Sequence, residues 1–103
     1  MGDACANPYT HTAAVLQAAR LGFVNRYALQ PHETGDCLEN KDATESVAAD
    51  LGGALDALEA DTALVQAVGA GLVANHVGIK RHEITRTAEL QGDALRDYYI
   101  RFV

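Results

Sequence analysis

Residues 7–22, NPYTHTAAVLQAARLG, carry the strongest structural signal in the chain. Asn7 is a favoured helix N-cap, and Pro8 suits the first helical position because its missing N–H would be unpaired there anyway. The alanine-rich run that follows predicts a helix from Pro8 to about Arg20, with Gly22 as its terminator. Its small side chains offer a surface that permits close packing.

The next segment, from Phe23 to about Ser46, has no steady hydrophobic period and contains Pro31, Gly35 and several Asp, Asn and Thr residues. This composition predicts an extended loop. Residues 21–29 are the only stretch in which the sequence suggests a short extended segment. Burial of two large side chains in this stretch is expected to hold the loop in place. These two side chains are Tyr27 and Leu29.

Two short helices follow the loop. Asp50 or Ser46 can cap a helix over residues 51–60, whose leucines recur at spacings of four and three and make one apolar face. Asp61 can then cap a third helix that ends near Gly69.

The longest predicted helix runs from Ala70 to about Leu90, and it has two apolar stripes. A helix with two stripes contacts neighbours on two sides, so one stripe is available for an interface. The first stripe consists of Val73, Val77, Ile84 and Ala88, and the second of Leu72 and Ile79.

The C-terminal residues predict one more helix. Asp93 can cap it, with Ala94 as its first residue, and its aromatic end at residues 98–103 suggests a docked C-terminus. The sequence therefore predicts a mainly α fold in a single small domain over residues 1–103.

Composition narrows the function classes. The net charge is −6, with 14 acidic against 8 basic residues, which disfavours nucleic-acid binding because that binding depends on cationic patches. The basic group formed by Lys80, Arg81 and Arg86 is interpreted as a solvated helix face.

The two cysteines, Cys5 and Cys37, lack metal spacing and predict reduced thiols, although a disulfide stays open. Because no secretory or membrane-spanning run is present, the expected location is the cytoplasm.

The titratable residues form no motif that identifies a site. On the long helix, His76, Lys80, His82 and Glu83 lack the second histidine of a zinc protease helix. Cys5 and His11 flank a helix start and are expected to point in different directions, so a catalytic cysteine is disfavoured.

Two further patterns have ordinary explanations. The pair Gly52-Gly53 follows no predicted strand, so helix packing is preferred over a phosphate cradle. The paired carboxylates are interpreted as surface charges. They are Asp56 with Glu59, and Glu33 with Asp36. From these residues alone, no catalytic, cofactor-binding or metal-binding residue is predicted.

Three segments in order resemble the glutamine synthetase family. The first is residues 2–9, GDACANPY, leading into the alanine-rich helix; the second is residues 54–61, ALDALEAD; the third combines residues 80–83, KRHE, with the Tyr pair at 98–99. Segments at 33–38 and 73–80 are similar to the type III, or glutamate–methylamine ligase, branch. The resemblance covers nearly the whole chain.

The resemblance implies an activity and its cofactors. Family members use ATP and magnesium or manganese to form γ-glutamyl phosphate from glutamate, which ammonia or an amine then displaces. The family's last metal-binding Glu and its phosphate-binding Arg lie upstream of the segment that matches residues 2–9. The matching residues here, Asp3, Asn7, Pro8 and Tyr9, are expected to be structural, so no catalytic residue is carried over.

Two hypotheses follow. In the first, the chain is the C-terminal, helical part of the α+β catalytic domain of a glutamine-synthetase-like ligase, begins just after the ligand-bearing strands and is catalytically incomplete alone. Its expected partners are the missing N-terminal part or full-length ligase subunits, in a homo-oligomer. In the second, it is a stand-alone helical interaction or oligomerisation protein derived from the ligase tail.

Overall fold

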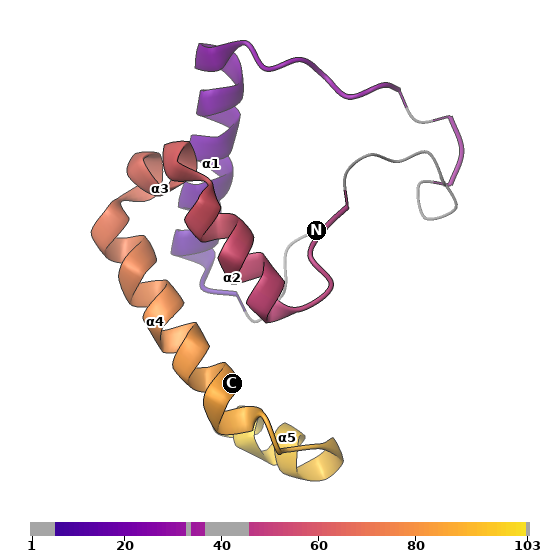
Figure 1. Ribbon diagram of the computed structural model, residues 1–103, viewed down its shortest axis with the longest axis vertical. Helices are drawn as coiled ribbons and strands as arrows, with labels where there is room; N and C mark the ends of the chain where they lie inside the picture. Colours follow the sequence, from indigo (N-terminus) through magenta and orange to yellow (C-terminus); the bar gives the residue numbers. More distant parts are fainter. Residues whose placement is uncertain (1–5, 33, 37–45, 103) are drawn as a thin grey trace.

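A computed structural model describes residues 6–32, 34–36 and 46–102. Its regular elements are five α-helices and a short 3-10 turn, and the described residues contain no strand (Figure 1). In chain order they are α1 (Pro8–Asn25), α2 (Leu51–Ala60), α3 (Thr62–Val68), α4 (Ala70–Thr87), α5 (Gly92–Tyr99) and the 3-10 turn η1 (Ile100–Phe102). The predicted mainly α fold is confirmed.

Side-chain caps explain where three of the helices begin. Asn7 Oδ1 accepts hydrogen bonds from the backbone N–H groups of Tyr9 and Thr10, at 3.0 and 3.2 Å. Asp50 and Asp61 accept in the same way from N–H groups in the first turns of α2 and α3, at 2.7 and 2.9 Å. Each cap satisfies donors that a helix start leaves unpaired, so these three predicted boundaries are confirmed.

The C-terminal end of α1 differs from the prediction. Gly22 lies inside the helix, which continues to Asn25 and ends where Arg26 takes a left-handed conformation at φ 52°. The N–H groups of Arg26 and Tyr27 donate to the carbonyls of Phe23 and Gly22, at 3.3 and 3.1 Å. This is the Schellman arrangement, which closes the helix although the left-handed position holds no glycine.

The segment after α1 also differs. The predicted extended stretch at 21–29 is helical up to Asn25, and the expected burial of Tyr27 and Leu29 is wrong, because their side chains are 59% and 96% exposed. Figure 1 shows this segment leaving the helices as a wide arc, where the described residues offer it no surface to pack against.

The predicted start of the last helix needs a smaller correction. Gln91 occupies the cap position and Asp93 lies within the first turn of α5, because the helix begins at Gly92, whose φ of +54° suits glycine. Asp93 forms an ion pair with Arg96 at 3.1 Å. The expected docking of the C-terminus is not seen for Ile100, which is 64% exposed.

The helices pack around α3, which contacts α1, α2 and α4. The buried core of the described residues consists of Leu55, Val73 and Val77, where α2 meets α4. Four half-buried apolar side chains pack against this core: Leu58, Val65, Val68 and Ile84. The first predicted stripe of α4 thus faces the core, apart from Ala88, which lies beyond the last residue of the helix and is exposed.

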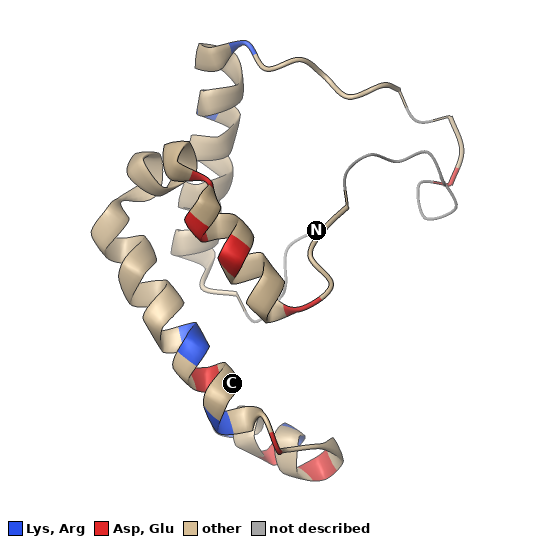
Figure 2. Ribbon diagram, in the orientation of Figure 1, with Lys and Arg blue, Asp and Glu red and all other residues tan. Residues whose placement is uncertain are grey.

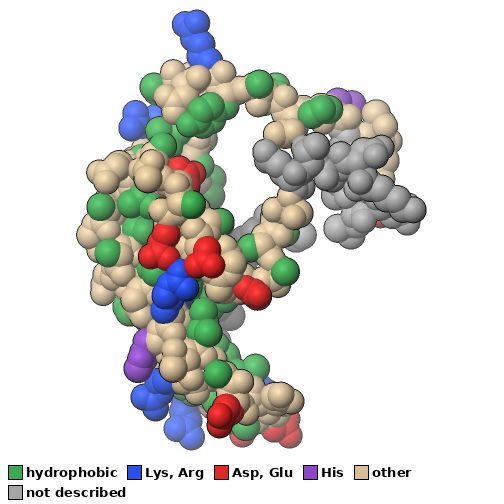
Figure 3. Space-filling view, in the orientation of Figure 1, with side chains coloured by type: hydrophobic (Ala, Val, Ile, Leu, Met, Phe, Trp, Pro, Cys, Tyr) green, Lys and Arg blue, Asp and Glu red, His purple; other side chains and the backbone are tan. Residues whose placement is uncertain are grey.

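Much of the apolar surface stays uncovered. The radius of gyration is 16.3 Å, compared with about 13 Å for a compact domain of 100 residues. Large hydrophobic side chains are exposed on α1, α2, α4, α5 and η1, and Figure 3 shows green side chains spread over the visible face. The helices thus form an open arrangement with a very small core.

Candidate functional site

The sequence-derived candidates for catalysis are scattered over the molecule. His11 lies on α1, whereas His76 and His82 lie on α4, and all three are exposed. Cys5, Glu33 and Cys37 are outside the described residues. Within the described ranges, no three His, Cys, Asp or Glu side chains come together in a group that can hold a metal ion.

The paired carboxylates of α2 hold α2 against α4. One nitrogen of the Arg81 guanidinium, Nη2, lies 2.5 Å from both Asp56 Oδ1 and Glu59 Oε2. Figure 3 shows basic and acidic side chains side by side in the middle of the visible face. The hydrogen bond to Asp56, which has the largest effect, and the hydrogen bond to Glu59 raise the pKa of Arg81 above its ordinary value. Arg81 is therefore an interhelical link, and not only part of a solvated face as the sequence suggested.

A second polar cluster joins α4 to α5. Lys80 Nζ donates to Glu83 Oε2 at 2.8 Å, and the Tyr99 hydroxyl donates to the same carboxylate. The bond from Lys80 lowers the pKa of Glu83, partial burial opposes that shift, and Tyr99 adds to it. In turn, the bond to Glu83 raises the pKa of Tyr99. Glu83 thus links α4 to α5 through Tyr99.

The three carboxylates Asp56, Glu59 and Glu83 are therefore not free to serve together as ligands of a divalent cation. Magnesium and manganese prefer several carboxylate or water oxygens converging on one point. Here Asp56, Glu59 and Glu83 are each engaged by a cation of the chain itself. Residues of this kind hold helices together, and no step of a reaction is assigned to them.

The glycine pair of α2 serves its cap. Gly53 N–H donates to Asp50 Oδ1 at 2.7 Å, and a side chain at Gly52 would meet the same oxygen at 3.3 Å. The carboxylate of Asp50 already occupies the helix N-terminus, where a phosphate would otherwise bind. The close approach to Asp50 gives Gly52 a local packing role that involves no nucleotide.

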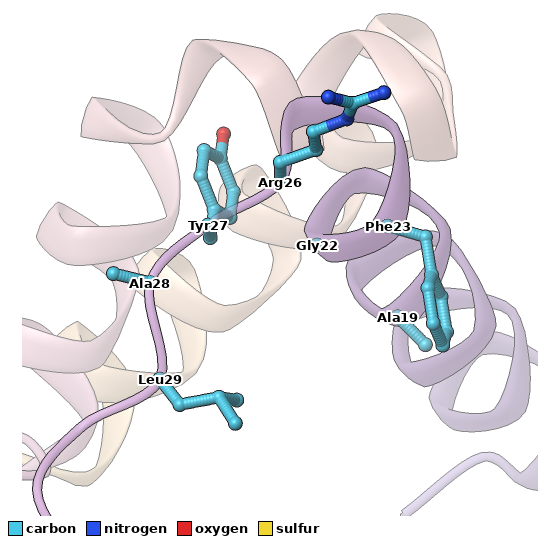
Figure 4. Close-up of a pocket in the computed structure, with 7 residues that line it drawn as sticks. All are labelled: Ala19, Gly22, Phe23, Arg26, Tyr27, Ala28 and Leu29. Atoms are coloured by element: carbon cyan, nitrogen blue, oxygen red, sulfur yellow. The ribbon is translucent and has the colours of Figure 1, made fainter.

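One feature was missed from the sequence, an open apolar hollow at the C-terminal end of α1 (Figure 4). Its volume is about 440 Å³. Phe23 and Ala19 form the wall on α1, and Leu29 lies across from them on the segment that follows. The left-handed turn at Arg26 creates the hollow by turning the chain back beside the helix. A non-glycine residue in that conformation leaves little trace in a sequence.

In residues 6–32, 34–36 and 46–102, the caps and the interhelical ion pairs hold together a set of helices with large uncovered apolar surfaces. The family model for the catalytic domain of glutamine synthetase matches residues 1–99, and the chain belongs to this family. No curated protein and no solved structure gave a match. Among the described helices, none is long and apolar enough to cross a membrane by itself; the bent pair α3–α4 passes that test only when taken together.

Proposed function

We propose that the chain is the C-terminal helical part of a glutamine-synthetase-like, ATP-dependent glutamate–ammonia or glutamate–amine ligase. Its role is to complete and support the catalytic domain, while the residues that bind ATP, glutamate and magnesium or manganese belong to the rest of the enzyme. The match to the catalytic domain over residues 1–99 supports this role. The similarity of residues 33–38 and 73–80 to the glutamate–methylamine ligase branch supports an amine as the second substrate.

The single observation that carries the proposal is that apolar surface stays uncovered on the helices of this chain, although the family to which the chain belongs is defined by a catalytic domain. Leu72 and Ile79 on α4 are 47% and 57% exposed, on the stripe that faces away from the buried pair Val73 and Val77. Surfaces of this kind on a soluble protein mark sites of contact with another protein surface. In a complete ligase, the partner surface is the sheet-bearing part of the catalytic domain, in the cytoplasm.

An activity assay tests this proposal. The chain is co-expressed with a glutamine-synthetase-family catalytic domain that lacks the segment matching residues 1–99, and ATP-dependent γ-glutamyl amide formation is measured with ammonia and with methylamine. We expect product from the combination and none from the chain alone. Product formation by the chain alone would overturn the proposal.

A matched pair of variants makes the assay specific. Ile79→Glu places a charge in the exposed stripe of α4 and is expected to abolish the gain of activity. Thr85→Glu adds the same charge at an exposed polar position of the same helix, six residues from Ile79 and therefore off the stripe, and should leave the gain intact. Equal activity of the two variants would show that the stripe is not the contact.

The same observation favours a second candidate, a stand-alone interaction protein that binds full-length ligase subunits. The exposed stripe of α4 would then lie in a complex between chains. This candidate predicts that the chain co-purifies with an intact ligase and alters its assembly without adding activity.

A further inference from the structure

The buried side chains of the described residues all belong to α2 and α4. Leu55 on α2 meets Val73 and Val77 on α4, and these three make up the buried core. The half-buried side chains that pack against this core come from α2, α3 and α4 as well. Burial of apolar surface is the main favourable contribution to folding. The stabilising interior of the chain therefore lies within residues 50–87, which we call the α2–α4 unit.

Polar contacts join the helices of the same unit. Arg81 on α4 forms ion pairs with Asp56 and Glu59 on α2, both at 2.5 Å. Figure 2 shows the acidic residues of α2 in red and basic residues of α4 in blue. Single residues connect the helices, since Asp61 lies between α2 and α3 and Gly69 lies between α3 and α4. The contacts between α2 and α4 therefore close only a short stretch of chain.

α1 is attached to the α2–α4 unit by a weaker contact. It has no buried residue, and it meets α3 through half-buried side chains, most of which are small or polar. Those side chains are Thr10, Ala14, Gln17, Leu21 and Gly22. The contact removes little apolar area from water and contributes correspondingly little free energy. It also closes a loop that includes residues 26–50, and the entropic cost of closure rises with loop length.

We propose that the α2–α4 unit is a separate folding unit, which stays folded when α1 leaves it. The dependence runs in one direction. Unfolding of the unit removes the surface of α3 on which α1 lies, whereas opening of α1 breaks none of the contacts among Leu55, Val73 and Val77. Segments of one native protein commonly open with different free energies. The inference rests on contacts within the chain and does not depend on the ligase role.

The proposal also describes how the chain would meet the sheet-bearing part of a catalytic domain. The stripe formed by Leu72 and Ile79 lies on α4, within the unit, so a partner that covers this stripe contacts a surface that is already ordered. Contact with α1 includes the cost of ordering a helix, which lowers the net affinity. The chain thus offers one preformed contact and one that is ordered on binding.

Native-state hydrogen exchange on the whole chain, followed by mass spectrometry, tests the proposal. Amides in residues 51–87 are expected to be protected at least about tenfold more than those of α1. Ala14→Glu places a charge in the contact with α3 and should lower the protection of α1 about tenfold or more, while protection in residues 51–87 stays unchanged. The matched control Ala19→Glu, at an exposed position on the far side of α1, should change neither.

Leu55→Ala tests the opposite direction. The cavity that it leaves should lower protection in residues 51–87 about thirtyfold or more, and the protection of α1 should fall with it. Equal protection of α1 and α4 in the unmodified chain would overturn the proposal. It would also be overturned if Ala14→Glu lowered protection in residues 51–87 as much as in α1, or if α1 kept its protection when the unit lost its own. None of these outcomes bears on the ligase assay, which measures product formation by the combined parts.

Discussion

The bend between α3 and α4 depends on the backbone of Gly69, and replacing this residue tests the fold. The two helices meet at 107°, and Gly69 bridges them with φ 118° and ψ 111°. Its N–H donates to Val65 O, and its carbonyl accepts from Val73 N, both at 3.0 Å. These two bonds end one helix and begin the next, so the unusual backbone conformation is held in place from both sides.

We expect Gly69→Ala to destabilise the chain by about 1–3 kcal/mol, the cost of holding a residue with a Cβ in a sparsely populated backbone region. A Cβ at this position would meet no atom within 4 Å, so steric overlap with neighbours adds nothing to this cost. The matched control is Gly78→Ala in the interior of α4, where a Cβ also has open space. That change should stabilise the helix by about 1 kcal/mol.

Urea unfolding followed by circular dichroism measures both changes. Each variant removes one glycine from the unfolded chain, so the effect on the unfolded state is similar and the difference reports the conformation at position 69. The two variants are expected to move the unfolding midpoint in opposite directions. If Gly69→Ala stabilises the chain as much as Gly78→Ala does, the bend does not require glycine and the reasoning fails.

Changes at four further residues are expected to alter the free energy of unfolding, measured in the same way. Leu55→Ala removes a side chain that is 2% exposed and should cost about 2 kcal/mol or more. Asp61→Ala should cost about 1 kcal/mol, whereas Asp61→Asn keeps the cap and should be nearly neutral. The folded-state pKa of Glu83 lies below its ordinary value of 4.5. The stabilisation that ionised Glu83 gives to the folded chain is therefore complete above pH 4.5 and is lost as the pH falls toward the lowered pKa. Glu83→Gln should remove this acid-induced loss of stability. The pKa of Tyr99 is raised above 10.0. The stabilisation that the protonated Tyr99 hydroxyl gives to the folded chain is therefore complete below pH 10 and is lost as the pH rises through the raised pKa. Tyr99→Phe should abolish this loss of stability at alkaline pH.

Helix starts were predictable because their signals are local. Asn7, Asp50 and Asp61 each sit directly before an apolar or small-residue run, and their oxygens reach N–H groups only two or three residues away. Nothing distant is needed to form such caps. The stripe of α4 that contains Val73 and Val77 was predictable for a similar reason, because the period of a helix fixes which side chains share a face.

Helix ends and loop contacts were less predictable. Gly22 resembles a terminator, but a glycine inside a helix costs only about 1 kcal/mol and does not stop it. The observed end depends on Arg26 adopting a left-handed conformation, for which the sequence gives no sign. The expected burial of Tyr27 and Leu29 assumed a surface that the described residues do not provide.

The interhelical contacts could not be predicted from the sequence either. Arg81 is 25 and 22 residues from its two carboxylate partners, so their pairing depends on how α2 crosses α4. Asp56 and Glu59 share a helix face by spacing, but no local pattern identifies the cation that reaches them. The family, in contrast, could be predicted, because its motifs follow one another along the chain.

Hydrogen exchange of α4 tests the central claim most directly. The measurement compares amide protection in residues 70–87 of the chain alone with that in the chain co-expressed with the sheet-bearing part of a ligase catalytic domain. The account predicts a clear gain of protection in the complex, since the exposed stripe at Leu72 and Ile79 then becomes covered. Equal protection in the two states would contradict the claim that these helices complete a glutamine-synthetase-like ligase.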